Sequence, residues 1–201
     1  MLFREAAKLL EEAGFTRDGA SLLTPDGQPF TLEIIEYSPG LARVTQPFVK
    51  NLQRLGIQAA LRVVDPAQFQ ARLNDFDFDI CSRRYSLTAT FSDGLRELWD
   101  SKAASLPGSA NLSGIQDPVV DTLIDKSLAA ATREDMNTAV RALDRVLRSG
   151  YYWVPGWNKP LHTVAFWDMF GYPEKPPFYD FPVETTWWVD QAKAEKIGKA
   201  G

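Results

Sequence analysis

The sequence contains a single cysteine, Cys81, and a single histidine, His162, among its 201 residues. One cysteine cannot form a disulfide within the chain, and zinc sites built from paired cysteines are excluded. A catalytic set of the Ser-His-Asp or Cys-His type would have to use His162, yet the chain has no Gly-x-Ser-x-Gly motif to accompany it. We therefore interpret His162 as a structural residue.

The sequence also has no long apolar run and no excess of positive charge. No stretch approaches the roughly 18 apolar residues that a membrane-spanning helix needs. The first thirty residues carry charges where a signal peptide would be apolar, so we expect this chain as written to be soluble. The formal net charge is −4 without a basic block, which argues against a surface that follows nucleic-acid phosphates.

Aromatic residues and prolines are unevenly distributed. Residues 151–190 hold 13 of the 24 aromatic residues, five of the six tryptophans and six of the 13 prolines. These rings could cap the core of a sheet, or they could line a groove for peptides or sugars, since tyrosine and tryptophan offer rigid contact area with a polar group. Trp187 and Trp188 cannot both face one side of a strand, so at least one should meet another layer or a partner.

The first half of the chain has the pattern of an α/β fold. We predict strands over Phe30–Tyr37, Ile57–Val64 and Phe76–Ser82, with helices over Leu41–Leu55 and Pro66–Asn74 between them, after a first helix over Phe3–Ala13. Strands that alternate with helices imply parallel pairing through crossover connections.

The second half begins as helices and then changes character. Asp117-Pro118 and Thr132 are typical helix starts, and the apolar spacing that follows each one predicts a helical hairpin up to Gly150. Beyond Gly150 the chain is expected to be extended, with Tyr152–Trp157 and Leu161–Trp167 as candidate strands.

Several acidic residues are weak candidates for metal binding or for catalysis of hydrolysis. Asp75, Asp77 and Asp79 alternate with phenylalanines, which suits a solvated turn better than a metal site. Asp93-Gly94 could form a turn, and Glu97 and Asp100 follow on a short predicted helix that presents Trp99. None of these acids has a partner that would mark a glycosidase-like pair. A hydrolase that cleaves peptides or sugars through Asp93 is the alternative that these acids leave open.

Arg83, Arg84 and Tyr85 follow the third predicted strand directly. The carboxyl ends of parallel strands form the usual ligand crevice of open α/β sheets. Two adjacent guanidinium groups at such an edge can hold a carboxylate or phosphate through forked hydrogen bonds, although exposed arginines can also serve solubility alone.

Several motifs resemble one protein family. They are Ala7–Phe15, Leu52-x-x-Leu-Gly-Ile57, the Phe78-Asp79 strand, Asn111–Ile124 and Tyr152-Trp-Val-Pro155. In this order they resemble the family 5 extracellular solute-binding proteins, the peptide- and oligopeptide-binding components of bacterial ABC importers. Three further segments resemble the branch that serves microcin C-type peptide importers: Leu106–Asn111, Arg141–Leu147 and Thr185–Asp190.

The resemblance implies a fold and a setting. The fold would be an α/β, periplasmic-binding-protein-like lobe with a central, mainly parallel sheet flanked by helices and an extended aromatic C-terminal segment. Such proteins are longer and two-lobed, so we expect a fragment in which 1–170 form the second lobe and 171–201 cross toward a missing first lobe. The parent protein would be periplasmic, would need no cofactor, and would pass a peptide or peptide conjugate to a membrane permease.

The resemblance also implies where ligand would bind. In the family a carboxylate that holds the peptide ammonium follows an aromatic residue after this strand; here Tyr85 takes the aromatic position and Thr88 the position of the acid. Asp93 is the nearest carboxylate, so either it substitutes or the ligand is longer or modified, with anionic groups at Arg83 or Arg84. The full expected set of ligand contacts is Arg83, Arg84, Tyr85, Thr88, Asp93, Asn111, Trp153 and Trp157. Besides the transport protein and the hydrolase, a purely structural interaction domain remains open, for which changes at Arg83 and Tyr85 would affect no ligand.

Overall fold

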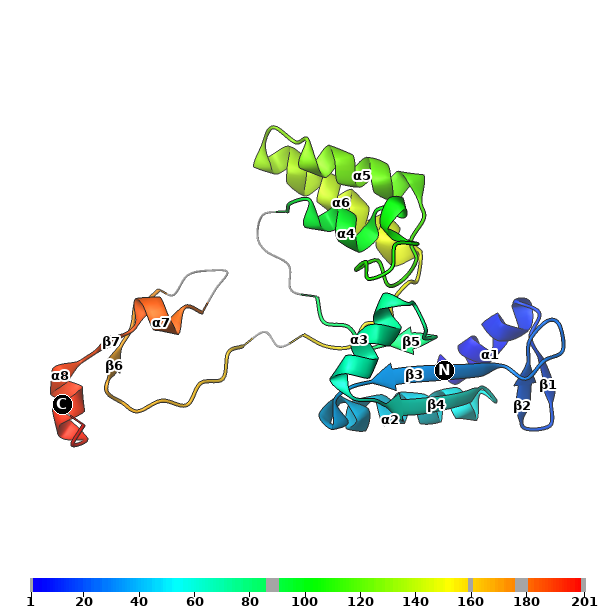
Figure 1. Ribbon diagram of the computed structural model, residues 1–201, viewed down its shortest axis with the longest axis horizontal. Coiled ribbons are helices and arrows are strands. Elements are labelled where there is room, and N and C mark those ends of the chain that lie inside the picture. The colour runs from blue at the N-terminus through cyan, green and yellow to red at the C-terminus, as the bar shows by residue number, and fades with distance from the viewer. Residues whose placement is uncertain (1, 86–90, 159–160, 176–180, 200–201) are drawn as a thin grey trace.

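The computed structural model describes residues 2–85, 91–158, 161–175 and 181–199. Figure 1 shows an α/β part, a helical part above it and a small C-terminal part reached through an extended stretch of chain. In chain order the elements are α1 (Leu2–Glu12), β1 (Thr16–Asp18), β2 (Ser21–Leu23), β3 (Thr31–Glu36), α2 (Pro39–Arg54), β4 (Gln58–Val63), α3 (Pro66–Asn74), β5 (Ile80–Cys81), α4 (Gly94–Trp99), a 3-10 turn (Ser101–Ala103), α5 (Pro118–Leu128), α6 (Arg133–Ser149), β6 (Phe170–Gly171), α7 (Val183–Thr186), β7 (Trp188–Val189) and α8 (Gln191–Lys196).

The central sheet has the order β4-β3-β5 and is parallel throughout, which confirms the α/β prediction. Alternate residues of β3 enter two cores. Ile34 packs with Val49 of α2, whereas Ile35 packs with Phe69 and Leu73 of α3. Because successive strand side chains point to opposite faces, β3 is covered on both sides, as a central parallel strand should be.

Helix starts follow the predicted capping chemistry. The carboxylate of Asp65 accepts hydrogen bonds from the backbone N–H groups of Ala67 and Gln68, both at 2.9 Å. Asp117 accepts from Val119 at the start of α5, and Thr132 accepts from Asp135 at the start of α6. These bonds satisfy backbone donors that have no partner inside the helix.

Gly56 lets the chain turn sharply from α2 into β4. Its φ is +89°, and a Cβ at this position would lie 2.9 Å from the carbonyl oxygen of Ala20. The carbonyl of Gly56 accepts from the N–H of Leu22, so the turn also fastens the β1–β2 hairpin to the sheet. Only glycine fits both the backbone angle and the close approach.

The third strand is shorter than predicted. The expectation of a strand over Phe76–Ser82 was wrong for its first four residues, because Phe76 has a φ of +55° and turns the chain. The side chain of Asp79 then accepts a hydrogen bond from the N–H of Glu33 at 2.7 Å, in the place where a strand carbonyl would stand. Regular pairing to β3 therefore starts only at Ile80.

The helical part is built around the predicted hairpin. Helices α5 and α6 pack against each other along their length, and α4 packs on α5. Their core consists of Leu95, Ile115, Val120, Ile124, Leu143 and Leu147, all of them buried. None of the helices in the described part of the chain is both long and apolar enough to span a membrane.

The strands expected over Tyr152–Trp157 and Leu161–Trp167 are wrong for the residues that the structure describes there. Instead, Phe170–Gly171 and Trp188–Val189 form a short antiparallel pair. Proline denies a strand one ladder donor, and the described residues of 151–168 lie beside no strand that could supply the other bonds. Aromatic content alone therefore gave a false strand signal.

Candidate functional site

The carboxyl edge of the parallel sheet is the place where β3 ends at Glu36 and β5 ends at Cys81. The segment Ser82–Tyr85 leaves the sheet from this edge. The hydroxyl of Ser82 donates a short hydrogen bond to Oε1 of Glu36, and the hydroxyl of Thr45 on α2 donates to the same oxygen at 2.9 Å. Glu36 itself is completely buried. The start of the segment is therefore fixed to the sheet and to α2.

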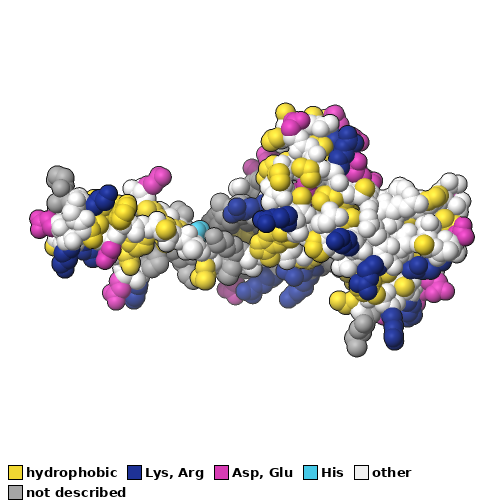
Figure 2. Space-filling view, turned by 90° about the horizontal axis from the view of Figure 1, so that it is seen from below, with side chains coloured by type: hydrophobic (Ala, Val, Ile, Leu, Met, Phe, Trp, Pro, Cys, Tyr) yellow, Lys and Arg dark blue, Asp and Glu magenta, His cyan; other side chains and the backbone are white. Residues whose placement is uncertain are grey.

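Arg83 and Arg84 are exposed in the middle of this segment. The ion pairs among the described residues involve neither of them. Figure 2 shows lysine and arginine side chains over the middle of the molecule, next to exposed hydrophobic side chains. The sheet edge thus presents two adjacent guanidinium groups that are not neutralised by a described carboxylate.

Tyr85 ends the segment and packs edge-on against Trp153, with ring centroids 6.3 Å apart. Trp153 also meets Trp99 at 6.3 Å and Tyr152 at 5.8 Å, and it packs on the core of the helical part. Burial raises the pKa of Tyr85, so its phenol stays neutral at neutral pH. Of the predicted site residues, Arg83, Arg84, Tyr85 and Trp153 are brought into one region.

Asn111 has a different place. It is completely buried, and its amide donates to the carbonyls of Asp100 at 3.2 Å and Ile115 at 3.0 Å while accepting from the N–H of Ile115 at 2.9 Å. Both of its donors are therefore used by the backbone. Asn111 holds together the loop that enters α5, and a contact with ligand stays a prediction.

The remaining predicted positions lie apart from this edge or outside the description. Trp157 is 68% exposed and is not among the aromatic neighbours of Trp153. Thr88 lies outside the described residues. His162 stacks on the ring of Phe181, with centroids 5.0 Å apart and the planes nearly parallel, and its structural role stays a prediction.

Two of the three alternating acids, Asp77 and Asp79, are occupied by contacts within the protein. Asp77 pairs with Arg72 at 2.8 Å, and Asp79 holds the N–H of Glu33 as described above. Among the described residues no three His, Cys, Asp or Glu side chains are grouped as a metal site would require.

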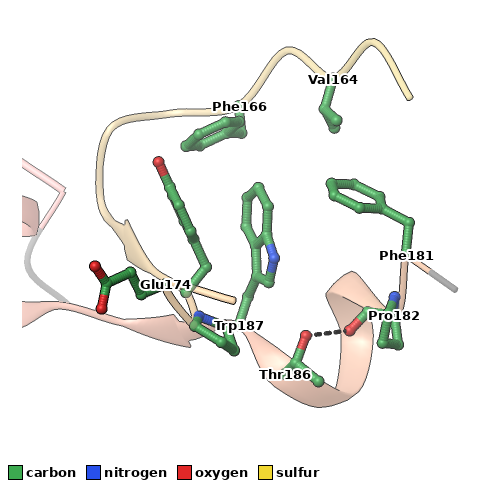
Figure 3. A pocket seen from close by; sticks show the side chains of 9 residues that line it. Val164, Phe166, Glu174, Phe181, Pro182, Thr186 and Trp187 are labelled. Atoms are coloured by element: carbon green, nitrogen blue, oxygen red, sulfur yellow. Dashed lines mark hydrogen bonds between the residues drawn. The ribbon is translucent and has the colours of Figure 1, made fainter. Parts of the chain in front are cut away.

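The C-terminal aromatic residues form a cluster of their own. Trp187 lies at its centre, with ring centroids 4.7 Å from Phe166, 5.0 Å from Tyr172 and 5.9 Å from Phe181. These rings line a cavity of about 260 Å³ together with Val164 and Pro182. Figure 3 shows the indole of Trp187 between Phe166 and Phe181. The aromatic stretch therefore divides between Trp153, which covers the helical core, and this separate cluster.

Comparison with known proteins assigns the chain to a family. The family model for bacterial extracellular solute-binding proteins, family 5 (middle region), matches residues 3–106. The chain belongs to this family. A relative from Agrobacterium fabrum, named "Probable peptide-binding protein YejA", is 36% identical over 190 residues, which are 94% of this chain and 31% of that protein. The peptidoglycan-binding protein YepA of the same organism is 32% identical over 185 residues, 91% of this chain and 30% of YepA.

Solved structures agree on the fold. The periplasmic oligopeptide-binding protein of an ABC transporter from Thermotoga maritima, solved with bound mannohexaose, superposes with a TM-score of 0.66 at 20% sequence identity. The match covers 76% of this chain and 30% of that protein. The periplasmic-binding-protein fold predicted from the motifs is thereby confirmed. The chain spans about a third of the length of the family relatives that it matches.

Family membership gives no support to the hydrolase alternative, and neither does the geometry of Asp93. Its carboxylate is 92% exposed, and its charged neighbour is Arg96, 3.6 Å away. Arg96 in turn bonds Asp125 at 2.7 Å, and this hydrogen bond raises the pKa of Arg96. The carboxylate of Asp93 is therefore an exposed partner in a surface ion pair.

Cys81, at the end of β5, should react slowly with alkylating reagents. Burial raises the pKa of its thiol from 9.0 to about 11, so the reactive thiolate at pH 8 should be about 100-fold scarcer than for an ordinary cysteine. The rate of iodoacetamide labelling, compared with that of the same chain in urea, measures this directly. Equal rates in the two states would contradict the burial of the thiol.

The same shift makes stability depend on pH. Below pH 9 the thiol is neutral in both the folded and the unfolded chain, so the full stability is present. As the pH rises from 9 through 11 the unfolded thiol ionises first, and the fold loses stability. Cys81→Ser should remove this part of the alkaline loss in unfolding experiments.

Proposed function

We propose that this chain is the second lobe of a two-lobed solute-binding protein, which binds a peptide or peptide conjugate between its lobes and delivers it to an ABC permease. Membership of the family supports a binding role, and the YejA and YepA relatives are named for peptides and peptidoglycan. Residues 1–170 would make up the lobe and 171–201 the extension toward the first lobe. The site of action would be the periplasm, as for the Thermotoga maritima protein.

The observation that carries the proposal is the pair Arg83 and Arg84 at the carboxyl edge of the sheet, which forms no ion pair with a described residue. Ligands of open α/β sheets bind at this edge. Arg83 and Arg84 would hold a carboxylate of the ligand through charge-assisted hydrogen bonds, and Tyr85, backed by Trp153, would form the adjacent wall. Thr88, Asp93, Asn111 and Trp157 remain candidate contacts of the same ligand or of the facing lobe.

Exposed apolar side chains support an interface with the rest of a longer protein. Tyr151 is 90% exposed, Trp157 68% and Leu161 73%. They lie on the extended chain between the helical part and the C-terminal cluster. Several large apolar side chains left in water along one stretch are typical of a surface that another part of a protein covers. Closure of two lobes by a hinge would then trap the ligand without any chemical step.

A retention experiment tests the ligand site. A tryptic digest of casein is divided, and the carboxyl groups of one half are blocked as methyl esters carrying an isotope label. The full-length protein that contains this chain should retain free peptides about tenfold more than the esterified ones, because only a carboxylate can accept forked bonds from guanidinium groups. The double variant Arg83→Gln/Arg84→Gln should lose this preference.

Arg145→Gln provides the matched control, because Arg145 is also exposed but lies on α6, away from the sheet edge. Its selectivity should equal that of the unmodified protein. Retention of neither half of the digest would contradict peptide binding itself. Equal retention of both halves would agree with peptide binding but would show that Arg83 and Arg84 do not hold a carboxylate of the ligand.

A further inference from the structure

The buried carboxylate of Glu36 stands directly behind the proposed ligand segment. We propose that Glu36 is a positioning residue for the ligand site, which acts through Ser82 to hold Arg83 and Arg84 at the edge of the sheet. This inference rests on the proposed function, because it concerns the same arginine pair. Glu36 does not touch ligand itself, since its side chain is completely buried in this chain.

Two hydroxyl groups from different elements converge on one oxygen of Glu36. Thr45 reaches Oε1 from α2, and Ser82 reaches it from the residue after β5. Glu36 ends the central strand β3, so its carboxylate joins the middle of the sheet, a covering helix and the departing segment at one point. Inside a protein a hydrogen bond is stronger than one exposed to water. Ser82 is therefore held more firmly than a serine whose hydroxyl group faces solvent.

The other oxygen of Glu36 makes this arrangement costly. Oε2 is buried and has no hydrogen-bond partner among the described residues. Burying a carboxyl oxygen without a hydrogen bond costs free energy, and an apolar side chain here would avoid that cost. Stability alone therefore does not explain the buried carboxyl group. Its role would be to hold Ser82, one residue ahead of the arginine pair.

The segment is fixed at its other end as well. Tyr85 packs edge-on against Trp153, so Arg83 and Arg84 lie between a hydrogen-bonded residue and a packed ring. Two long side chains on a backbone held at both ends lose less conformational freedom when a ligand binds. Release of the Ser82 end should therefore weaken carboxylate binding even though no ligand contact is removed.

A pair of hydroxyl deletions tests the inference, with the casein digest and the full-length protein as above. Ser82→Ala should lower the retention of free peptides by about fivefold, because the loss of about one hydrogen bond frees the segment. Thr45→Val removes the other bond to the same oxygen but leaves the Ser82 bond in place, so its retention should stay within about twofold. Glu36→Ala should behave like Ser82→Ala. Glu36→Gln should restore most of the retention, because its carbonyl oxygen can accept both hydroxyl groups.

The outcomes separate this inference from the proposed function. If Ser82→Ala and Thr45→Val lower retention equally, or if neither does, Glu36 does not position the arginine pair. If Glu36→Gln fails to restore retention while its thermal unfolding is unchanged, the hydrogen bond between Glu36 and Ser82 does not account for the loss of peptide retention. If the unmodified protein retains no peptide, the proposed function fails, and this inference fails with it.

Discussion

Replacement of Asn111 by leucine is expected to lower the free energy of unfolding of the helical part by about 4 kcal/mol, the cost of two buried backbone groups left unpaired. Asn111 is completely buried, and its amide makes two hydrogen bonds to carbonyls and accepts a third. Leucine has nearly the same size but no polar atom. The substitution would leave both backbone groups of Ile115 without their partner, whereas the carbonyl of Asp100 would keep the hydrogen bond from the N–H of Ala103.

Hydrogen exchange of the amides in α5 and α6 measures this loss where it occurs, because exchange reports local as well as global opening. Asn51→Leu is the matched control. Asn51 lies exposed on α2, and the change there should stay within about 0.5 kcal/mol, as is usual for surface positions. Protection of α5 and α6 that survived Asn111→Leu would show that water or another group replaces the amide.

Local patterns in the sequence were enough to predict the α/β part. Asp65-Pro66 marked the start of α3, and the apolar spacing of three and four residues marked α2, since both signals act within a few residues. The parallel pairing then followed from the alternation of strands and helices. In these elements the local conformational preference and the packing of the core favour the same structure.

The third strand shows where local patterns fail. Alternating acids and phenylalanines resemble a strand, but Asp79 uses its side chain to take the hydrogen bond that a backbone carbonyl would have accepted. That choice depends on Glu33, which is 46 residues away along the chain. The side chain of Asp79 and a backbone carbonyl compete for the N–H of Glu33, which is distant in the sequence. The spacing of polar and apolar residues does not predict the outcome of this competition.

The candidate site was predictable only in part. The position of Arg83 and Arg84 after a parallel strand placed them at the carboxyl edge of the sheet. The bond between Ser82 and Glu36 and the edge-on packing of Tyr85 against Trp153 join residues far apart in sequence, so no local pattern predicted them. One signal was present: Glu36 stands two residues after the buried Ile34, which puts a carboxylate on an inward face of a strand.

Trp187 and Trp188, which are neighbours near the C-terminus, lie in different environments. The sequence indicated that they could not face the same side. Trp187 is the ring at the centre of the aromatic cluster, whereas Trp188 is 54% exposed and lies across the strand pair from Gly171. The two tryptophans are therefore expected to contribute differently to the stability of the C-terminal part.

Trp187→Ala is expected to lower the local stability of the C-terminal part by about 3 kcal/mol, the lower end of the cost of removing a packed tryptophan. The loss follows because the rings of Phe166, Tyr172 and Phe181 all pack on this one indole. The amide of Asp190 is a direct reporter, since it donates to the carbonyl of Met169 at 2.8 Å beside the short sheet. Its hydrogen exchange should accelerate about 100-fold, as 3 kcal/mol corresponds to roughly two powers of ten.

Trp188→Ala serves as the matched control for this prediction. Its indole covers Gly171 so closely that a Cβ there would lie 2.4 Å from the ring, but more than half of Trp188 is in contact with solvent. Removal of a half-exposed ring forfeits less buried apolar area, so the amide of Asp190 should exchange only about tenfold faster, or about 1.4 kcal/mol. The helical part, which neither tryptophan touches in its core, should keep its protection in both variants. Equal acceleration by the two substitutions would mean that the C-terminal part is held by the strand pair and not by the cluster around Trp187.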